Sequence, residues 1–333
     1  MYSLVKLILK IPKLRGLLLR IFRKYWVIKI AKHFDIVDFH SFNSFYASIV
    51  NSLLKFDKKI CVTHWGSDIL RASDEEIRKQ KRILKKVDQV RTISTEIHNK
   101  IQNLKINTKV FQCKFGVDGV DKIARFMERG NTNIATKNLK HIFPNFDFHN
   151  KKVIIIGNNG SKSQQHLEIL RSLKGISEYL ESIRCIFVIP LTYGIDRLYK
   201  KEIIEELDQL GVEHLLLDKY LNEEAFISLT ILTDIYITMQ TSDAFSFYLQ
   251  EQLASGTIVL YGEWLSYSEL TNSDVYMKSV NFDTISIRLK KTLINLNAEK
   301  ELAKLHNKEK LLEISSWNNL SKKWFESYFS IYG

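Results

Sequence analysis

One segment near residue 240 constrains the fold more than any other, because it places two carboxylates between two expected strands. The apolar run 234–239 predicts a strand, a polar loop and a short helix follow it, and 257–261 predicts a second strand. This order is typical of a parallel sheet, where the loop and the helix N-terminus lie at the carboxyl edge. Nucleotides bind at that edge in α/β folds, since the free N–H groups of the helix face phosphate.

The two carboxylates are Asp243, before the helix, and Glu251, about two turns along it. Two interpretations are open. In the first, Asp243 contacts a sugar and Glu251 contacts a ribose of the same ligand. In the second, Asp243 is the N-cap of the helix and Glu251 is a solvated helix residue.

The rest of the chain repeats the alternation of strands and helices in two halves, which predicts α/β layers with mainly parallel sheets. Strands are expected at 35–39, 59–63, 89–93, 109–112, 152–157, 184–189, 213–217, 234–239 and 257–261. Helices are expected at 43–55, 74–86, 95–103, 164–180, 196–210 and 222–230, with a helical tail over 283–331. A length of 333 residues also favours two domains. The polar segment 124–150, rich in Asn and Lys, is expected to be irregular and to connect them.

The net charge of +12 predicts an acidic partner, and nucleic acid, an anionic membrane surface and a phosphorylated small molecule all qualify. Residues 1–33 carry many Lys and Arg and no acid. A helix over 14–30 would place apolar side chains beside these cations, which suits a helix lying in a membrane interface. The alternative is a helix packed on the core, with its basic side chains reaching solvent. A second basic run over 78–86 lacks the aromatic interleaving typical of a nucleic-acid surface, and nucleic acid is not an expected partner.

Cysteine content and hydropathy suggest a compartment. Cys61, Cys113 and Cys185 are widely spaced and odd in number, which favours a reducing cytoplasm over a disulfide framework or a zinc site. No apolar run reaches the roughly 18 residues that cross a bilayer. We therefore expect a cytoplasmic chain, peripheral at the inner face of the plasma membrane.

Polar residues also follow other expected strands. His40 ends the first strand, and His64, Trp65 and Asp68 surround a glycine turn at the end of the next. A histidine beside an aspartate at a strand end is placed for ligand contact or proton transfer, unless it is simply hydrogen-bonded into the turn. Two such strand ends would face the same crevice.

The turn at 157–163, Gly-Asn-Asn-Gly-Ser-Lys-Ser, follows a strand in the second half. Its glycines allow close backbone approach, and Lys162 is able to balance a diphosphate. It matches neither the P-loop nor the dinucleotide motif, and a tight turn of this kind needs no ligand. After the strand at 184–189, the segment Pro-Leu-Thr-Tyr-Gly offers Tyr193 as a stacking ring.

Together these residues resemble the GT-B glycosyltransferases, which have two facing Rossmann-like domains. Asp243-x7-Glu251 is similar to the Glu-x7-Glu motif of the retaining branch, and Glu-Gln-Leu-Ala-Ser-Gly at 251–256 to its Glu-Ala-Met-Ala-x-Gly helix. The segments 63–68 and 116–118 and the closing Ser-Trp at 316–317 match common positions of this family. The 157–166 loop and the 190–194 segment are similar to the bacterial 4-acetamido-fucose transferases, which extend lipid-linked glycans. The likeness runs from about residue 35 to the C-terminus and is strongest over 153–260.

The resemblance implies a metal-independent transfer of a sugar from a nucleotide donor, linked to UDP or dTDP, to a lipid-linked or polysaccharide acceptor of the bacterial envelope. It implies that Glu251 binds the ribose and Asp243 the sugar hydroxyls, with His64 near the reacting sugar. The other implied donor contacts come from backbone or polar groups of Gly157, Asn159, Ser161, Lys162, Tyr193, Ala244 and Phe245. Acceptor-side residues would be His40, Trp65 and Asp68.

The chain is expected to divide into four segments. They are a basic amphipathic helix over 1–34, an acceptor-side domain over 35–145, a donor-binding domain over 150–310, and a final helix over 311–333 that packs back towards the N-terminal domain. Two departures from the family stand out: aspartate replaces the first glutamate, and the N-terminal domain is reduced. Its sheet is small, is completed by a partner subunit, or continues before Met1. A non-catalytic GT-B-like subunit that partners an active transferase is therefore an alternative function.

Overall fold

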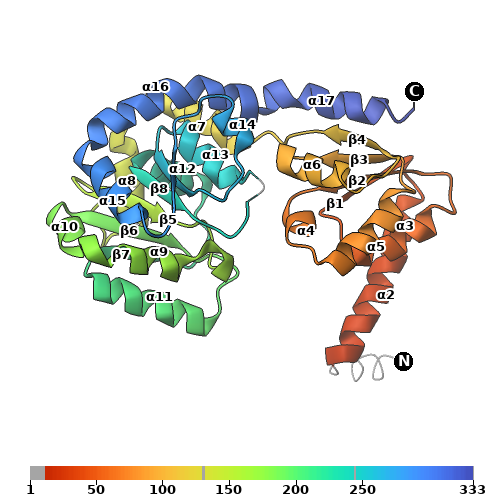
Figure 1. The fold of residues 1–333 in the computed structure, drawn as a ribbon, viewed down its shortest axis with the longest axis horizontal. Coiled ribbons are helices and arrows are strands. Elements are labelled where there is room, and N and C mark those ends of the chain that lie inside the picture. Colours follow the sequence, from red (N-terminus) through yellow and green to blue (C-terminus); the bar gives the residue numbers. More distant parts are fainter. Residues whose placement is uncertain (1–11, 130–131, 244, 333) are drawn as a thin grey trace. The chain divides into compact units, whose positions relative to one another are not determined.

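The computed structural model describes residues 12–129, 132–243 and 245–332, which divide into two compact units. The N-terminal unit contains the described residues up to Cys113 together with those from Phe325 on. The C-terminal unit contains Lys114–Trp324. Each unit has one parallel sheet with helices packed on it, as Figure 1 shows. The predicted α/β class with two parallel sheets is confirmed.

The sheet of the N-terminal unit has four parallel strands that lie side by side in chain order. These strands are β1 (Ile36–His40), β2 (Lys59–His64), β3 (Gln89–Thr92) and β4 (Lys109–Gln112). Its helices are α2 (Pro12–Ala31), α3 (Ser44–Leu53), α4 (Ser67–Leu70), α5 (Asp74–Leu84) and α6 (Thr95–Gln102). α5 begins where Ser73 accepts a hydrogen bond from the N–H of Glu76, and the acids of its first turn favour the positive helix end.

The C-terminal unit has a six-stranded parallel sheet in the order β10-β9-β8-β5-β6-β7. Its strands are β5 (Lys152–Ile156), β6 (Cys185–Pro190), β7 (Glu213–Leu217), β8 (Ile235–Thr238), β9 (Ile258–Gly262) and β10 (Lys278–Val280). From β5 the chain adds β6 and β7 towards one edge of the sheet. It then returns to the other side of β5 for β8 and adds β9 and β10 towards the opposite edge. Neighbouring β5 and β8 therefore form the switch point of a doubly wound sheet, where a crevice opens at the carboxyl ends.

Helices cover both faces of this sheet, because β5, β6 and β8 are buried on both sides. One apolar core lies under α9 (His166–Ser172), α11 (Arg197–Leu210) and α15 (Ile285–Ile294). The other lies under α7 (Asp118–Glu128), α8 (Thr132–Ile142), α12 (Glu223–Leu232) and α13 (Phe247–Ala254). The remaining helices are η1 (Lys162–Gln164), η2 (Lys174–Ile176), α10 (Ser177–Ser182), α14 (Ser268–Thr271), α16 (Leu296–Ser315) and α17 (Trp317–Phe329). The last residues of α17 belong to the N-terminal unit.

Three sequence-based expectations are wrong. The segment 124–150 is not irregular, because it contains the end of α7 and all of α8, whose Ala135 and Leu139 are buried one turn apart. Residues 114–145, expected in the N-terminal domain, lie in the C-terminal unit, since α7 and α8 pack on α13 and α12. The helix expected at 164–180 is broken into short pieces, and the first break lies at Gln165, which adopts a left-handed conformation with φ of 58°.

Candidate functional site

The turn after β5 begins at the switch point of the C-terminal sheet. Gly157 donates its N–H to the carbonyl of Ile237 on β8 at 2.9 Å, which ties the turn to the neighbouring strand. Its φ of +70° is one that a side chain disfavours, and a Cβ there would lie 2.7 Å from Nε2 of buried His166. Glycine is therefore required at this position by conformation and by space.

The turn after β5 and the segment after β8 are joined by hydrogen bonds. The N–H of Thr241 donates to the carbonyl of Ser163 at 2.8 Å, and Nε2 of Gln164 donates to Oε1 of Gln240 at 2.8 Å. Trp264 donates its indole N–H to the carbonyl of Gln240 at 2.8 Å. The amide nitrogen of Gln240 is buried and has no hydrogen-bond partner among the described residues. These hydrogen bonds hold the two sides of the switch point together.

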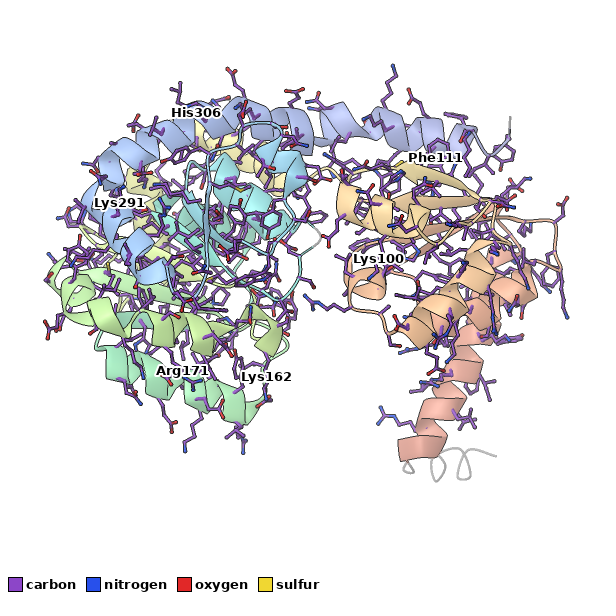
Figure 2. All side chains as sticks on the ribbon, in the orientation of Figure 1. Lys100, Phe111, Lys162, Arg171, Lys291 and His306 are labelled. Carbon is purple, nitrogen blue, oxygen red and sulfur yellow. The ribbon has the colours of Figure 1, made fainter. Side chains whose placement is uncertain are left out.

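Within the turn, Asn159 and Ser161 bond mainly to the turn itself. Oδ1 of Asn159 accepts the N–H of Ser161 at 2.8 Å, and its amide nitrogen donates to the hydroxyl of Tyr193 at 3.2 Å. The Ser161 hydroxyl lies 3.0 Å from that of Ser163. Lys162, labelled in Figure 2, has an exposed side chain whose Nζ lies 3.2 Å from a carboxylate oxygen of Asp196. Of the residues predicted in this turn, Lys162 offers an exposed cation, while Asn159 and Ser161 stabilise the backbone.

A cavity of about 160 Å³ opens beside this turn, at the carboxyl ends of β5, β6 and β7. Tyr193 and Tyr220 form its aromatic edge, with ring centroids 6.3 Å apart and an angle of 17° between the planes. The Tyr193 ring is 54% exposed and the Tyr220 ring is 73% exposed, so a planar group can stack on them. Tyr248 of α13 lines the inner side. The ring predicted at 193 therefore belongs to a real cavity.

Asp243 is not the N-cap of α13, because Ser246 holds that position and accepts the N–H of Leu249 at 3.2 Å. One carboxylate oxygen of Asp243 accepts the N–H of Ser246 at 3.2 Å and the hydroxyl of Tyr267 at 2.6 Å. Burial and the charge of Asp243 raise the pKa of Tyr267 well above its usual value, so the phenol remains a donor. Asp243 is held in place just before the helix.

The loop between Asp243 and Ser246 leads into α13. Ala244, expected to contact phosphate, lies outside the described residues. Phe245 is buried and has a φ of 73°, which is strained for an aromatic residue. Nζ of Lys114 lies 5.8 Å from the centre of the Phe245 ring, and burial lowers the pKa of this lysine. A second cation therefore lies beside the loop.

Glu251 is mostly buried, so the alternative of a solvated helix residue is wrong. Its carboxyl lies against the first turn of α7, where a Cβ on Gly119 would come within 1.9 Å of Oε1. It has no hydrogen bond or ion pair with the described residues. Burial raises the pKa of Glu251 to about 8, and the negative charge of Asp118 adds to the shift. A buried acid without a partner is a candidate ligand contact.

In the N-terminal unit, His64 is completely buried at the end of β2. Its Nδ1 lies 2.9 Å from Asp68, whose carboxylate also accepts the N–H groups of Phe42, Trp65 and Gly66. Burial opposes ionisation of Asp68, yet its interactions with His64 and these N–H groups bring its pKa below the usual value. The pair therefore organises the 64–68 turn, and neither side chain faces solvent.

His40 and Trp65 are partly exposed beside this turn. The indole N–H of Trp65 donates to Nδ1 of His40 at 3.0 Å, and Nε2 of His40 lies 3.4 Å from Asp38. The Trp65 side chain is 43% exposed. As expected, the ends of β1 and β2 lie together, and the surface that they expose is aromatic.

Several residues of the C-terminal site were missed from the sequence. Tyr220 follows β7 and was accessible to the same strand-end reasoning that found Tyr193. No local pattern marks Lys114, Gly119, Gln240 or Tyr267, which reach the site only through the fold. Among the described residues there is no group of three or more His, Cys, Asp or Glu side chains that could hold a metal ion.

Comparisons with solved structures identify the fold. HepE from Anabaena, in complex with UDP and glucose, superposes with a TM-score of 0.72 at 12% identity, covering 92% of this chain and 81% of that one. A UDP-forming α,α-trehalose-phosphate synthase from Burkholderia xenovorans, in complex with glucose-6-phosphate, gives 0.71 at 12% identity, covering 95% and 78%. A glycosyltransferase from Rickettsia africae ESF-5 gives 0.69 at 15% identity, covering 92% and 80%. No protein-family model and no curated protein matches the sequence.

These neighbours are glycosyltransferases of the GT-B fold, and the chain has that fold. At such low identity the likeness extends to the fold alone.

Proposed function

We propose that the chain is a glycosyltransferase that uses a nucleoside diphosphate sugar as donor. The observation that carries this proposal is Glu251, a mostly buried carboxyl without a partner among the described residues, on the helix that follows β8 of the switch point. A ribose brings two hydroxyls that donate hydrogen bonds to such a group. The neighbours that carry UDP and glucose, or form UDP, support this choice of ligand.

We propose that the cavity at the carboxyl ends of β5, β6 and β7 binds the base of the donor. Tyr248 lines this cavity and lies one helical turn before Glu251 on α13, so a base on the Tyr193–Tyr220 edge leaves its ribose near the carboxyl. We propose uracil or thymine, the bases of UDP and dTDP. The diphosphate then lies towards the turn after β5 and the start of α13, where Lys162 and Lys114 supply positive charge.

Charge stabilisation is the main chemical task of this site. The leaving nucleoside diphosphate gains negative charge as the sugar departs, and preorganised cations and N–H groups lower the barrier. We propose that Lys162, Lys114 and backbone N–H groups near Phe245 perform this task without a metal ion. Asp243, fixed by Tyr267, would bind the sugar hydroxyls, and the resemblance to Glu-x7-Glu enzymes supports retention of the anomeric configuration.

On the acceptor side we propose that Trp65 stacks on a sugar ring, because its exposed indole is held by His40. His64 and Asp68 would be positioning residues for the turn that carries Trp65. The resemblance to bacterial 4-acetamido-fucose transferases supports a lipid-linked or polysaccharide acceptor of the cell envelope. We therefore propose action at the cytoplasmic face of the plasma membrane.

The test is thermal unfolding of the full chain with and without UDP, dTDP and ADP. A nucleotide at one hundred times its Kd stabilises the folded state by about 2.7 kcal/mol, so UDP or dTDP should raise the Tm by several degrees. Glu251→Ala should remove this rise, while Glu309→Ala, an exposed control on α16 of the same unit, should keep it. If neither UDP nor dTDP changes the Tm at millimolar concentration, the proposal is wrong.

A non-catalytic GT-B-like subunit is the second candidate. It is favoured because His64 is fully buried and Asp243 is bound by Tyr267, so neither predicted catalytic side chain is freely presented. Both candidates bind nucleotide, and turnover separates them. Release of UDP or dTDP from a panel of sugar nucleotides by the isolated chain, lost in Glu251→Ala, would exclude the second candidate.

A further inference from the structure

The first described helix, α2, has an apolar face that none of the described residues of the N-terminal unit covers. Leu17, Ile21, Phe22, Tyr25 and Trp26 recur at spacings of four and five, which places them on one side of the helix. Each of these side chains is more than half exposed. Towards its C-terminal end α2 packs on α3, and Ala31 is buried there. The face therefore lies away from the core of its own unit.

The charge of α2 restricts what can cover this face. The helix contains six Lys or Arg residues and no Asp or Glu. Of these, Arg20 and Lys24 form no ion pair with any described residue. A protein partner of mixed charge would leave such cations unbalanced, whereas an anionic lipid surface supplies both apolar chains and negative headgroups.

A cavity of about 320 Å³ lies between α2 and α3, at the margin of the apolar face. Arg20, Ile21 and Lys24 line it from α2, and Ser44, Phe45 and Ser48 line it from the start of α3. Glu76 accepts the N–H of Ser44 at 2.5 Å but does not line the cavity. The lining thus combines two cations, two hydroxyls and two apolar side chains, which matches a phosphate attached to a glycerol or alkyl group.

We propose that this cavity binds the headgroup phosphate of an anionic phospholipid, while the apolar face of α2 enters the bilayer beside it. Ile21 belongs to both surfaces, so a lipid whose phosphate meets Arg20 and Lys24 has its acyl chains next to Leu17 and Tyr25. This inference deepens the proposed function. It rests on that function only for the premise that the chain acts at a membrane. None of the helices in the described ranges is long and apolar enough to cross one, and none needs to for this mode of binding.

Flotation of the full chain with vesicles tests the proposal. We expect binding to vesicles of phosphatidylcholine with added phosphatidylglycerol, and little binding to phosphatidylcholine alone. Loss of one cation near an anionic surface weakens binding about fivefold, so Arg20→Gln/Lys24→Gln should weaken it about 30-fold. Phe22→Ser/Trp26→Ser should abolish it. All four side chains lie on the surface, and circular dichroism with thermal unfolding should show that the variants fold.

A charge-matched control separates a specific cavity from diffuse attraction. Arg82→Gln/Lys85→Gln removes the same two residue types from exposed positions of the N-terminal unit. Equal losses for the two pairs would overturn the headgroup site. A dimer in sedimentation equilibrium without lipid, made monomeric by Phe22→Ser/Trp26→Ser, would show that a second copy covers the face and would also overturn it.

Two further readouts keep this proposal apart from the donor site. Nucleotide-dependent stabilisation, measured without vesicles, should be the same in all of these variants as in the unchanged chain. Inorganic phosphate at the concentration of vesicle lipid phosphate should not displace the chain from vesicles. Displacement would show that the cavity binds free phosphate, and it would overturn the proposal that the cavity binds a lipid headgroup. Vesicle binding that persists in Glu251→Ala would support the membrane site even if the donor site fails.

Discussion

Two mostly buried carboxyls, Asp38 of the N-terminal unit and Glu251 of the C-terminal unit, behave oppositely. Asp38 on β1 of the N-terminal unit pairs with Arg91 and accepts hydrogen bonds from Thr63 and Tyr328. Burial opposes the ionisation of Asp38. Its hydrogen bonds with His40 and Tyr328 and the charge of the Arg91 guanidinium nevertheless bring its pKa below the usual value. Glu251 of the C-terminal unit has no such partners, and burial raises its pKa to about 8.

The difference separates a carboxyl within a structural network from one that we propose to bind a ligand. Arg91 is completely buried, donates to the hydroxyl of Ser327 at 2.7 Å, and stacks 3.9 Å from the ring centre of Tyr328. The network fastens the end of α17 to β1 and β3 within the N-terminal unit. Glu251 is about as buried as Asp38, yet its carboxyl has no hydrogen bond or ion pair with the described residues. Similar burial thus accompanies two different roles.

The largest expected effect comes from breaking the N-terminal network. Arg91→Met keeps an unbranched side chain but leaves Asp38 as a buried charge without its cation, which typically costs about 3–5 kcal/mol. Denaturant unfolding followed in the N-terminal unit should show this loss. Arg78→Met, at an exposed position of the same unit, should change stability little. A loss below about 1 kcal/mol for Arg91→Met would mean that the network is not what holds α17.

The second prediction uses the opposite titration of the two carboxyls. The folded chain keeps a proton on Glu251 up to a pH of about 8, whereas the unfolded chain releases it near 4.5. Raising the pH between these values therefore favours unfolding of the C-terminal unit, by at most about 1.4 kcal/mol per pH unit. Asp38 contributes stability above its unfolded pKa of 3.8, and this contribution is lost as the pH falls through its lower folded value.

The measurement is stability against pH for the unchanged chain and for Glu251→Gln, which cannot titrate. Glu251→Gln should flatten the slope between about pH 5 and pH 8, the range between the pKa of Glu251 in the unfolded and in the folded chain. It should also be more stable than the unchanged chain at the upper end of this range. Glu309→Gln is the exposed control and should leave the slope unchanged. Identical slopes for the unchanged chain and Glu251→Gln would refute a buried, protonated Glu251.

The third prediction concerns the residue that makes room for Glu251. Alanine is normally better than glycine in a helix by about 1 kcal/mol. A Cβ at Gly119 would nevertheless lie 1.9 Å from Oε1 and 2.7 Å from Cδ of Glu251. Gly119→Ala should therefore destabilise the C-terminal unit by about 1–3 kcal/mol and remove its stabilisation by UDP or dTDP.

Two comparisons sharpen this result. Gly175→Ala is the matched control, since no atom lies within 4 Å of a Cβ at that glycine. In a Glu251→Ala chain the clash is gone, so Gly119→Ala should become neutral or stabilising there. A Gly119→Ala variant that is stabilised in both chains would show that the carboxyl does not lie against α7.

Much of the fold could be predicted from the sequence because its signals are local. The Val-Ile-Ile-Ile run of β5 and the glycine after it identify a buried strand and its turn without knowledge of its neighbours. α8 was missed because Thr, Asn and Lys make up six of its eleven residues and hide Ala135 and Leu139 one turn apart. β10 was missed because three residues carry no period.

The site was predictable only as far as chain order fixes it. Gly157, Tyr193 and the start of α13 follow parallel strands, so the sequence order alone brings them to one edge. Tyr267 lies 24 residues after Asp243 in an irregular region, and Gly119 reaches Glu251 through helix packing. Such pairings depend on tertiary contacts that no spacing rule contains. The burial of His64 likewise follows from the packing around its turn, and the sequence gives no sign of it.

The smallest expected effect is at Tyr267, whose hydroxyl donates to Asp243. Tyr267→Phe should cost about 1 kcal/mol, because Asp243 keeps the N–H of Ser246 and gains water in place of the phenol. Tyr332→Phe, at an exposed site, is the control and should cost almost nothing. The same change in an Asp243→Asn chain tests the pairing. A cost there equal to that in the unchanged chain would mean that the phenol acts through other neighbours. A smaller cost would show that Asp243, like Asp38, is held by hydrogen bonds within its own unit. Of Asp243 and Glu251, it would then be Glu251 whose carboxyl we propose is free to bind a ligand.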